Sequence, residues 1–425
     1  MAITITVPYG NGSCSCSVSD KRSVSILRPA HLADAQSASE EDIIRAALDT
    51  PFDSPRLSEL ARGKKKIVVL TSDHTRPVPS HLTLPPLLEA LRSASPEAQI
   101  TILIATGCHR GSTPDEIVRK FGAAFAARER IINHDPHDAA GLVSLGRLPS
   151  GGELVINRLA AEADLLVADG FIEPHQFAGF SGGRKSVLPG IASLKTVLAS
   201  HNAEFTVHPK ARPGILEGNP FHIDMLFAAR RAKLAFILNV VLSPAKRVSA
   251  AFAGDTDSAH RAGCDFVLRH CGVERVCAPV VITSNGGYPL DQNIYQATKS
   301  IMVADRLCES GGVIIAVNEC RDGHGSEAFY RTFKEAASLS ALLQAIEKRG
   351  REETLPDQWV IQLTASILRK RRIIFVSAAP APMISAFGMV PAPSLAAAVR
   401  MSEDFIDLPD APITVLPDAV SLLVR

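Results

Sequence analysis

The sequence lacks an excess of charge of either sign. Its 425 residues contain 45 Lys and Arg against 44 Asp and Glu, which gives a formal net charge of +1 at pH 7. Proteins that bind nucleic acid or acidic membrane surfaces by electrostatics carry a basic excess or a basic face. The balance therefore predicts no nucleic-acid partner and no membrane partner.

Cysteine pairs and a secretion signal are also missing. The eight cysteines form neither a CxxC pair nor a spacing typical of zinc ligands. Cys14 and Cys16 lie too close in sequence for an ordinary structural disulfide. The first residues, MAITITVPYGNG, have no basic or long apolar segment and alternate apolar residues with threonine, as a strand does. We therefore expect reduced thiols in a cytoplasmic protein.

One long run has no charge, from Val376 to Val399, and its 24 residues could be mistaken for a membrane span. It contains four prolines, Pro380, Pro382, Pro391 and Pro393. Each proline inside a helix removes a backbone donor and costs about 3 kcal/mol. The run is therefore predicted to be a buried strand followed by a proline-rich loop.

Short apolar runs bounded by turn residues recur along the chain and predict buried strands. These runs are Lys66–Leu70, Ile100–Ala105, Leu165–Ala168, Ala235–Leu242, Val280–Thr283, Val313–Val317 and Ile373–Val376. Helical patterns lie between several of them, at Pro85–Ser93, Thr113–Phe121, Asn293–Leu307, Phe333–Lys348 and Asp357–Lys370. Because such alternation favours parallel sheets covered by helices, the predicted fold class is α/β.

The length and a hydrophobic content of 46% allow two or three cores. A new strand-loop-helix unit begins at Cys277–Pro279 and predicts a domain boundary near residue 275. We expect an N-terminal α/β domain over residues 1–275 and a C-terminal α/β domain over residues 276–402, with the active site in the cleft between them. Residues 403–425 resemble a strand-forming tail that could return to the first domain.

A glycine-rich segment, GFSGGRKS, offers the first candidate functional residues. Glycine lets the backbone approach a ligand closely, and the basic pair Arg184 and Lys185 suits an anionic cofactor. The segment nearly matches the nucleotide-binding P-loop, G-x-x-x-x-G-K-[ST]. Arg184 stands where that motif requires glycine, so the P-loop interpretation fails at a required position.

Polar side chains follow three predicted strands, in VVLTSDHTRPVP, ITILIATGCHRGSTPDE and LLVADGFIEPH. The first loop offers Asp73 and Arg76, the second offers His109 and Arg110, and the third offers His175. Loops at the carboxyl ends of strands build the ligand crevice of an open α/β sheet, so we expect these loops to share one edge. Taken singly, Asp73 and Arg76 could be a local surface ion pair, and each histidine could be structural.

These residue types suit an acid-base site that binds a carboxylate. An arginine binds carboxylates through two parallel hydrogen bonds, and Asp73 could orient the guanidinium of Arg76. A histidine with an ordinary pKa of about 6.5 can accept and return a proton near neutral pH. The helix after the second loop is expected to begin at an N-cap of Ser112 or Thr113.

The second half of the chain contributes GGYPLDQNIYQATKSI, in which Tyr295, Gln296 and Lys299 open a helix. Gln296 and Lys299 share a helix face, where an amide and an ammonium could converge on a carboxylate. The alternative is a solvated first helical turn. Trp359, the only tryptophan, is either a core anchor or a flat ring that stacks on a cofactor.

Together these motifs resemble the LarA family, the nickel-pincer lactate racemases and related 2-hydroxyacid racemases and epimerases. The segment DGFIEPHQFAGFSGGRKSVLPGIASLKTVLASH is similar to the family core, and the likeness extends through five motifs from about residue 65 to about residue 360. In that family the lysine after G-G-R is tethered by an amide to a pyridinium-derived mononucleotide that holds nickel through two sulfurs and a ring carbon. A downstream histidine completes the set of ligands of the nickel ion. By resemblance these residues are Lys185 and His201.

The resemblance also implies the remaining site residues. The acid-base pair would be His109 and His175. The cofactor would contact Ser181, Gly182, Gly183 and Trp359 in addition to Lys185. The substrate would contact Asp73, Arg76, Tyr295, Gln296 and Lys299. The segment Asn133-His134-Asp135 also resembles the family and could support the site, whereas His74 and His208 have no assigned role. The host's cofactor-biosynthesis enzymes would be partners, and a host without them would leave Lys185 unmodified.

The implied reaction is racemisation or epimerisation of a 2-hydroxy carboxylic acid by reversible hydride transfer. One histidine takes the hydroxyl proton as hydride leaves C2, the planar 2-keto acid reorients, and the other histidine returns the proton. Family members act on lactate, malate, longer hydroxy acids and sugar acids, so the sequence selects no single substrate.

The alternative is a cofactor-free binding or regulatory member of the same fold. Loss of Lys185, His109 or His175 would favour it, yet all three are present. A zinc hydrolase is disfavoured because no H-E-x-x-H or zinc spacing occurs.

Overall fold

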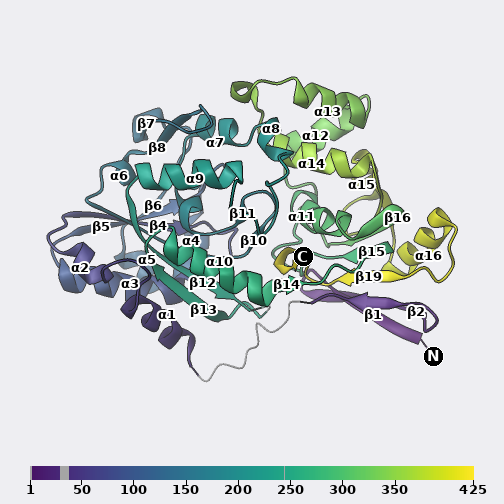
Figure 1. Cartoon of the computed structure of the whole chain (residues 1–425), viewed down its shortest axis with the longest axis horizontal. Coiled ribbons are helices and arrows are strands. Elements are labelled where there is room, and N and C mark those ends of the chain that lie inside the picture. Colours follow the sequence, from purple (N-terminus) through teal and green to yellow (C-terminus); the bar gives the residue numbers. More distant parts are fainter. Residues whose placement is uncertain (1, 29–37, 244) are drawn as a thin grey trace. The chain divides into compact units, whose positions relative to one another are not determined.

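A computed structural model of the chain describes residues 2–28, 38–243 and 245–425. Contacts between residues divide the chain into two compact units, whose elements are labelled in Figure 1. The first unit comprises residues 31–201 and 208–270. The second unit comprises residues 1–30, 202–207 and 271–425. Each unit contains one large sheet covered by helices, so the predicted α/β fold class is confirmed.

The first unit is built on a sheet with the strand order β13-β12-β9-β4-β5-β6. Its strands are β4 (Lys66–Ser72), β5 (Gln99–Ala105), β6 (Ile131–Asn133), β9 (Leu165–Phe171), β12 (Leu234–Leu242) and β13 (Val248–Gly254). Neighbouring strands are parallel except at one edge, where β13 pairs with β12 in the antiparallel direction. The strands that the sequence predicted in this region are confirmed, with small differences at their ends.

The central strands of this sheet are buried on both faces. The residues Ile67–Leu70 of β4 are all buried, as parallel strands covered on two sides require. Ile67 and Val69 share a core with α1 (Glu40–Asp49), α2 (Leu57–Ala61), α3 (Ser80–Ala94) and α4 (Pro114–Phe121). The 3₁₀ turn η2 (Gly183–Ser186) packs against β4, β9 and β12, and α9 (Pro220–Arg231) packs against η2. The glycine-rich segment therefore lies against the central strands of the sheet.

Smaller elements complete the first unit. They are α5 (Ala123–Arg128), η1 (Ala139–Gly141), β7 (Leu142–Arg147), β8 (Glu153–Asn157), α6 (Arg158–Ala161), β10 (Pro174–His175), β11 (Gly179–Phe180), α7 (Leu194–Ser200) and most of α10 (Ser258–Cys271). The short strands β10 and β11 pair in the antiparallel direction and bring His175 opposite Gly179.

The second unit has a sheet with the strand order β18-β17-β16-β15-β19-β3. Its strands are β3 (Val24–Ile26), β15 (Ala278–Thr283), β16 (Cys308–Val317), β17 (Arg372–Val376), β18 (Val390–Ala392) and β19 (Ile413–Leu416). Every neighbouring pair in it is parallel. The three strands predicted in this region are confirmed.

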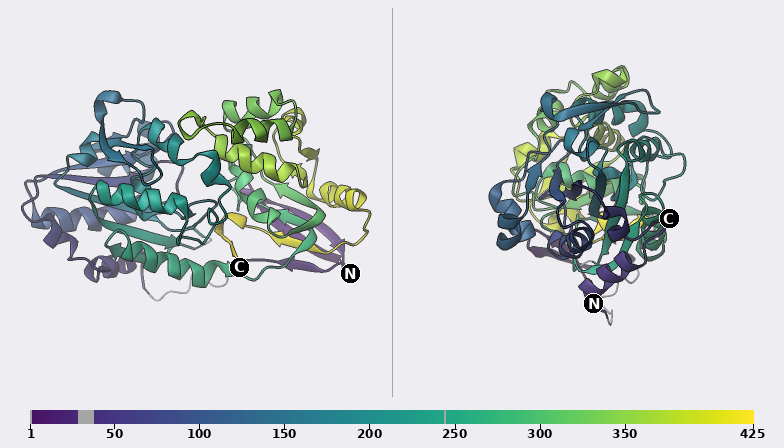
Figure 2. Two further views of the ribbon diagram at one scale, coloured as in Figure 1. Left: turned by 45° about the horizontal axis from the view of Figure 1, so that its top comes forward. Right: turned by 90° about the vertical axis from the view of Figure 1, so that its left-hand side faces the viewer.

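Two separate cores cover the faces of this second sheet. One core contains α11 (Ile294–Asp305), α12 (Glu327–Glu335), α13 (Leu339–Glu347), α14 (Gln358–Leu368) and α15 (Ala381–Ala386). The other contains α16 (Leu395–Ile406) and the hairpin of β1 (Ala2–Tyr9) and β2 (Gly12–Ser19). Figure 2 shows the yellow-green helices and the purple hairpin on opposite sides of the strands. The remaining elements are α8 (Ala203–Thr206), β14 (Gly272–Val273), η3 (Arg351–Glu353), η4 (Ala419–Ser421) and β20 (Leu423–Val424).

Each sheet has a point at which its strand order reverses. In the first sheet the chain runs outward from β4 through β5 and β6, and then continues with β9 on the other side of β4. In the second sheet it runs outward from β15 through β16, β17 and β18, and then places β19 on the other side of β15. Ligands of open α/β sheets bind beyond the carboxyl ends of the strands at such points. The loops after β4, β9 and β15 are therefore the expected site loops.

The domain boundaries differ from the sequence-based expectation in two respects. The sequence left open a return of the tail from residue 403 to residue 425 to the first domain, but β19 pairs with β15 and β3 inside the second sheet. All four residues of β19 are buried, as expected for a mainly apolar strand in the interior of a parallel sheet. The described N-terminal residues also join the second unit, because β3 extends its sheet and the β1–β2 hairpin packs on its core.

Two local predictions were also wrong. The helix predicted over Phe333–Lys348 is divided into α12 and α13, because Ser338 leaves the helical conformation and caps α13 by accepting from the N–H of Ala341. The proline-rich loop predicted after β17 contains α15. This helix forms because Pro382 lies in its first turn, where a missing N–H costs nothing.

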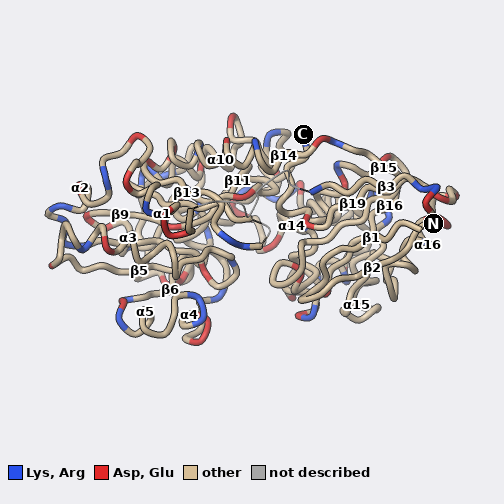
Figure 3. Tube along the Cα trace, turned by 90° about the horizontal axis from the view of Figure 1, so that it is seen from below, with Lys and Arg blue, Asp and Glu red and all other residues tan. Residues whose placement is uncertain are grey.

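The described part of the chain contains no helix that is both long and apolar enough to span a membrane. Positive and negative residues are interspersed along both units rather than gathered on one segment (Figure 3). The eight cysteines are all free thiols, as predicted.

Candidate active site

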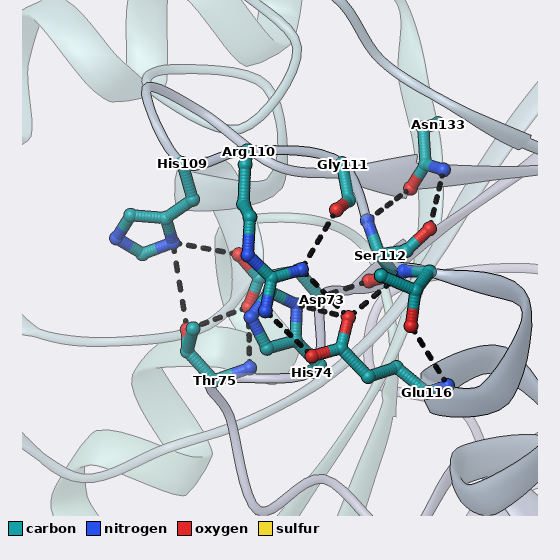
Figure 4. A network of polar contacts seen from close by, with 10 residues as sticks. Asp73, His74, Thr75, His109, Arg110, Gly111, Ser112, Glu116 and Asn133 are labelled. Atoms are coloured by element: carbon teal, nitrogen blue, oxygen red, sulfur yellow. Dashed lines mark hydrogen bonds and ion pairs between the residues drawn. The ribbon is translucent and has the colours of Figure 1, made fainter. Parts of the chain in front are cut away.

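Asp73 and His109 form a hydrogen-bonded pair between the loops that follow β4 and β5 (Figure 4). The Nδ1 atom of His109 lies 2.6 Å from Oδ2 of Asp73. The Asp73 side chain is 3% exposed, whereas the His109 side chain is 40% exposed. A buried carboxylate therefore orients an imidazole that a substrate can reach.

Local contacts keep the Asp73 carboxylate ionised. Its Oδ1 accepts from the backbone N–H of Thr75 at 2.9 Å and from the Thr75 hydroxyl at 2.6 Å. Burial by itself raises the pKa of Asp73, but the hydrogen bond and charge of His109, with the charge of Arg76, hold that pKa well below its usual range. Arg76 itself donates to Oγ1 of Thr75 at 3.2 Å. The carboxylate therefore bonds directly to Thr75 and His109, whereas the sequence analysis expected it to orient Arg76.

The loop that carries His109 is fastened to the start of α4 (Figure 4). Arg110 makes two hydrogen bonds to Glu116, at 2.6 and 2.8 Å, and these bonds lower the pKa of Glu116 to about 2. Thr113 is the N-cap of α4 and forms a capping box with Glu116. The side-chain amide of Asn133 exchanges two hydrogen bonds with the backbone of Ser112. Arg110 and Asn133 therefore support the loop.

The ring of Phe177 joins three of the predicted residues. It packs edge-on against His175 with 4.6 Å between ring centroids and against His201 with 5.3 Å. The Nζ atom of Lys185 lies 5.9 Å from the centroid of the same ring. Phe177 is buried, and nothing in the sequence singled it out. The structure thus gathers His175, Lys185 and His201 around one apolar ring.

His201 has the properties of a neutral imidazole ligand. It is 4% exposed and ends α7, where its Nδ1 donates to the carbonyl of Val197 at 2.9 Å. Burial, aided by the positive charge of Lys185, lowers the pKa of His201 to about 3. With the proton of the neutral ring on Nδ1, the lone pair is on Nε2. Metal-binding histidines use this arrangement, in which a carbonyl holds the N–H of the other nitrogen.

The glycine-rich loop uses several of its polar groups internally. The Ser181 hydroxyl donates to the carbonyl of Phe171 at 2.9 Å and accepts from the N–H of Glu173 at 2.9 Å. The N–H of Gly183 donates to Oδ1 of Asn239 at 2.7 Å. Gly182 has φ of +75°, and a Cβ there would lie 2.5 Å from the same Oδ1. The glycines are therefore required for close packing on β9 and β12, and Asn239 is a support that sequence reasoning missed.

Arg184, the residue that departs from the P-loop motif, lies beneath this loop. It is fully buried and donates to the carbonyl of Ala178 at 2.8 Å and to Nε2 of His260 at 2.6 Å. Longer contacts of 3.4 and 3.5 Å reach the carbonyls of Gly182 and Ser181. Burial lowers the pKa of Arg184 to about 10, which leaves it charged at neutral pH. The buried guanidinium of Arg184 thus binds backbone carbonyls of this loop. In a P-loop, by contrast, backbone N–H groups of the loop bind phosphate.

His222, on α9, makes stability depend on pH. Burial, with the charges of Arg184 and Arg261, lowers its pKa to about 3, against about 6.5 in an unfolded chain. Between these two values the unfolded state binds a proton that the folded state does not. The contribution of the neutral His222 to stability is therefore complete above pH 6.5 and is lost as the pH falls toward 3.

Between pH 7 and pH 5 the free energy of unfolding of the wild type is expected to fall by about 2 kcal/mol more than that of His222→Gln, as measured by urea unfolding. A His81→Gln variant, changed at an exposed position, serves as the control. Equal losses in wild type and His222→Gln would contradict the assignment.

The second unit holds the other predicted residues on α11 and α14. Gln296 and Lys299 are half-buried on the first turns of α11, whose N-cap is Asn293. Tyr295 packs edge-on against Phe329 with 5.5 Å between centroids. Trp359, on α14, packs against the core of this unit and is only partly buried. Its core role is thus observed, and a role toward a cofactor stays a prediction.

Two of the remaining histidines are explained by the structure. His134 is 2% exposed and bonds through Nε2 to the carbonyl of Ala192 at 3.0 Å, which supports the segment after Lys185. His74 lies 3.2 Å from the Ser112 hydroxyl. Among residues 2–28, 38–243 and 245–425, no group of three or more His, Cys, Asp or Glu side chains is arranged to hold a metal ion.

Comparison with known proteins identifies the family. Residues 9–214 match the lactate racemase N-terminal domain, and residues 273–424 match the lactate racemase C-terminal domain. The chain is 49% identical over 422 residues to a lactate racemase of Thermoanaerobacterium thermosaccharolyticum, with 99% of each chain covered. It is 45% identical over 424 residues to a lactate racemase of Lactiplantibacillus plantarum, with 100% of each chain covered. These similarities define the chain as an isomerase.

Solved structures agree with the sequence comparison. The structure of the lactate racemase apoprotein from T. thermosaccharolyticum matches with a TM-score of 0.95 at 49% identity, covering 100% of both chains. A Thermotoga maritima protein from structural genomics shares only the fold, with a TM-score of 0.69 at 20% identity over 92% of this chain and 100% of its own. The chain belongs to the lactate racemase family.

Proposed function

We propose that this protein racemises or epimerises a 2-hydroxy carboxylic acid, lactate or a larger relative, by reversible hydride transfer to a nickel-pincer nucleotide tethered to Lys185. The observation that carries the proposal is the grouping of His175, Lys185 and His201 around Phe177. This group follows β9, which is the neighbour of β4, and the loops after β4 and β5 together hold the Asp73–His109 pair. The full-length similarity to two lactate racemases supports the same reaction class.

The two histidines are held in complementary states. Asp73 accepts the Nδ1–H of His109, so Nε2 of His109 can accept the hydroxyl proton and Asp73 stabilises the imidazolium that forms. His175 accepts the N–H of Ala178 through Nδ1 at 3.3 Å, so the proton of its neutral ring is on Nε2. One imidazole is thus set to accept a proton and the other to donate a hydrogen bond. Racemisation by hydride transfer needs one group to take the hydroxyl proton of the substrate and another to return it after the planar 2-keto acid has reoriented, and such a pair can do both.

Cationic side chains would bind the substrate carboxylate. Arg76 follows β4 at the reversal point of the first sheet, and Lys299 lies on the helix that follows β15 at the reversal point of the second. Gln296 adds an amide on the same helix turn. Holding the carboxylate in a fixed place lowers the barrier by orienting C2 before reaction, an effect that can reach several kcal/mol.

The residues present fit the proposed cofactor. Lys185 is partly exposed on η2, and its amine can form the amide that tethers the nucleotide. His201 is buried and neutral, and imidazole nitrogen suits nickel. A nickel ion on His201 would take its other ligands from the nucleotide. When bound, the nucleotide supplies the hydride acceptor that the side chains lack. A relative solved as an apoprotein is consistent with a cofactor-dependent enzyme.

The direct test is the mass of the peptide that contains Lys185, measured together with nickel content. The protein is taken from its native host or produced with the cofactor-biosynthesis enzymes. We expect a nucleotide adduct on Lys185, about one nickel per chain, and racemisation of at least one 2-hydroxy acid. A bare lysine under these conditions would contradict the proposal and favour a cofactor-free binding or regulatory role.

A further inference from the structure

Asn285 lies at the reversal point of the second sheet and contacts the helix that carries Gln296 and Lys299. It follows β15 by two positions and is fully buried. Its own backbone N–H donates to Oδ1 of Asn318 at 3.0 Å, which ties it to the loop after β16. The backbone of Asn285 is therefore fixed at the end of the sheet, and its side chain extends from there to α11.

The side-chain amide of Asn285 spans one turn of α11. Its Nδ2 donates to the carbonyl of Gln296 at 2.7 Å, and its Oδ1 accepts from the N–H of Ser300 at 3.2 Å. These two backbone groups are four residues apart, the spacing of donor and acceptor in an α-helical turn. A side chain that enters this ladder can set the local direction of a helix. Lys299 lies within the spanned turn.

A second contact fastens the same turn. Oγ1 of Thr283, the last residue of β15, donates to the carbonyl of Ser300 at 3.2 Å. Nδ2 of Asn285 also donates to the carbonyl of Leu290 at 2.6 Å, in the loop that leads into α11. The turn from Gln296 to Ser300 is thus held to the end of β15 at both of its ends.

Packing alone does not account for an asparagine at the buried position 285. A buried leucine of similar volume would fill the space without the cost of burying a polar group. The amide instead makes hydrogen bonds to the one turn that presents Gln296 and Lys299. Both of these side chains are half-buried, so a shift of their backbone would move the amide and the ammonium together.

We propose that Asn285 is a positioning residue that places Gln296 and Lys299 for the substrate carboxylate. The inference rests on the proposed function, because it assigns a substrate to those two side chains. Asn285 touches neither substrate nor cofactor in this role. It acts through the backbone of the turn.

The test uses the cofactor-loaded full-length enzyme and a double-mutant cycle of Asn285→Leu and Lys299→Met. We expect Asn285→Leu to raise the KM for the 2-hydroxy acid about tenfold and to change kcat less than about threefold, because the weakened contact is lost equally in the ground and transition states while the remaining carboxylate contact still orients C2. In the Lys299→Met background the same change should raise KM clearly less than in the wild-type background, because only the contribution of Gln296 to carboxylate binding remains to be lost. Equal effects of Asn285→Leu in both backgrounds, or no effect on KM, would overturn the inference.

Two further variants distinguish a loss of positioning of Gln296 and Lys299 from a general loss of stability. Thr414→Val removes a buried hydrogen bond, 3.0 Å from Thr414 Oγ1 to the carbonyl of Val276, in the same sheet. It should lower the melting temperature but leave KM unchanged. Asn285→Asp keeps the acceptor for Ser300 and loses the donor to Gln296, and it applies the same test if the leucine variant does not fold. If Thr414→Val raised KM as much as Asn285→Leu, the positioning role would be wrong.

The wild-type control separates this inference from the proposed function. A loaded wild type that racemises no 2-hydroxy acid and binds none by calorimetry would overturn both. An active wild type whose KM is unaffected in Asn285→Leu and Asn285→Asp would overturn only the positioning role.

Discussion

Asp73→Asn is expected to lower kcat for racemisation by about 10²- to 10⁴-fold while the chain stays folded. The Asp73 carboxylate accepts from Nδ1 of His109 at 2.6 Å and is almost fully buried. An asparagine side chain can instead donate to Nδ1, which would place the proton of His109 on Nε2 and remove the lone pair that accepts the substrate proton. The variant would also lose the negative charge that stabilises the imidazolium. Steady-state kinetics in both directions measure the effect.

Glu116→Gln is the matched control for this prediction. Glu116 is a second carboxylate in the same network, but its hydrogen bonds go to Arg110 and Thr113. We expect this variant to keep kcat within about threefold of wild type, because such a contact supports the loop and leaves the His109 pair intact. A kcat of Asp73→Asn within threefold of wild type would contradict the role assigned to the pair.

His201→Ala is expected to reduce nickel from about one per chain to background and to abolish racemisation. The ring of His201 is 4% exposed, and burial keeps it neutral, with a pKa of about 3. The carbonyl of Val197 holds its Nδ1–H, so Nε2 is the nitrogen with the lone pair. Because the tether belongs to Lys185, the nucleotide mass should remain on that residue. Metal analysis and peptide mass on the same sample separate the two roles.

His134→Ala provides the corresponding control. His134 is also buried and is also held by a carbonyl, that of Ala192 at 3.0 Å. Its ring contacts support the segment after Lys185, so the variant should be less stable and yet retain nickel. Full nickel and activity in His201→Ala would show that another group binds the metal.

Much of the fold follows from the sequence because parallel interior strands are long apolar runs. β4, β5, β9 and β15 were predicted from such runs, and the polar residues after them mark the site edge. The helices with clear start signals were also found, as the Thr113 cap of α4 shows. Both kinds of signal are local, so a single sequence contains them.

The partners of buried polar groups could not be predicted in this way. Asp73 stands three residues before Arg76, yet its carboxylate bonds to His109, because neighbouring strands bring distant loops together. Phe177, Asn239 and Asn285 gave no sequence signal, since a single buried phenylalanine or asparagine resembles many others. The identity of their contacts depends on the strand order, which the sequence does not state.

Neither unit is a single continuous stretch of the chain, which affects how each could be produced by itself. Residues 202–207 immediately follow His201 but belong to the second unit, where α8 packs against α13 and α14. The hairpin β1–β2 and strand β3 also belong there, although they precede the first unit along the chain. A fragment that ends at residue 270 would contain these pieces without their sheet. Stop codons alone therefore cannot isolate either unit, and each would have to be assembled from non-adjacent stretches of coding sequence.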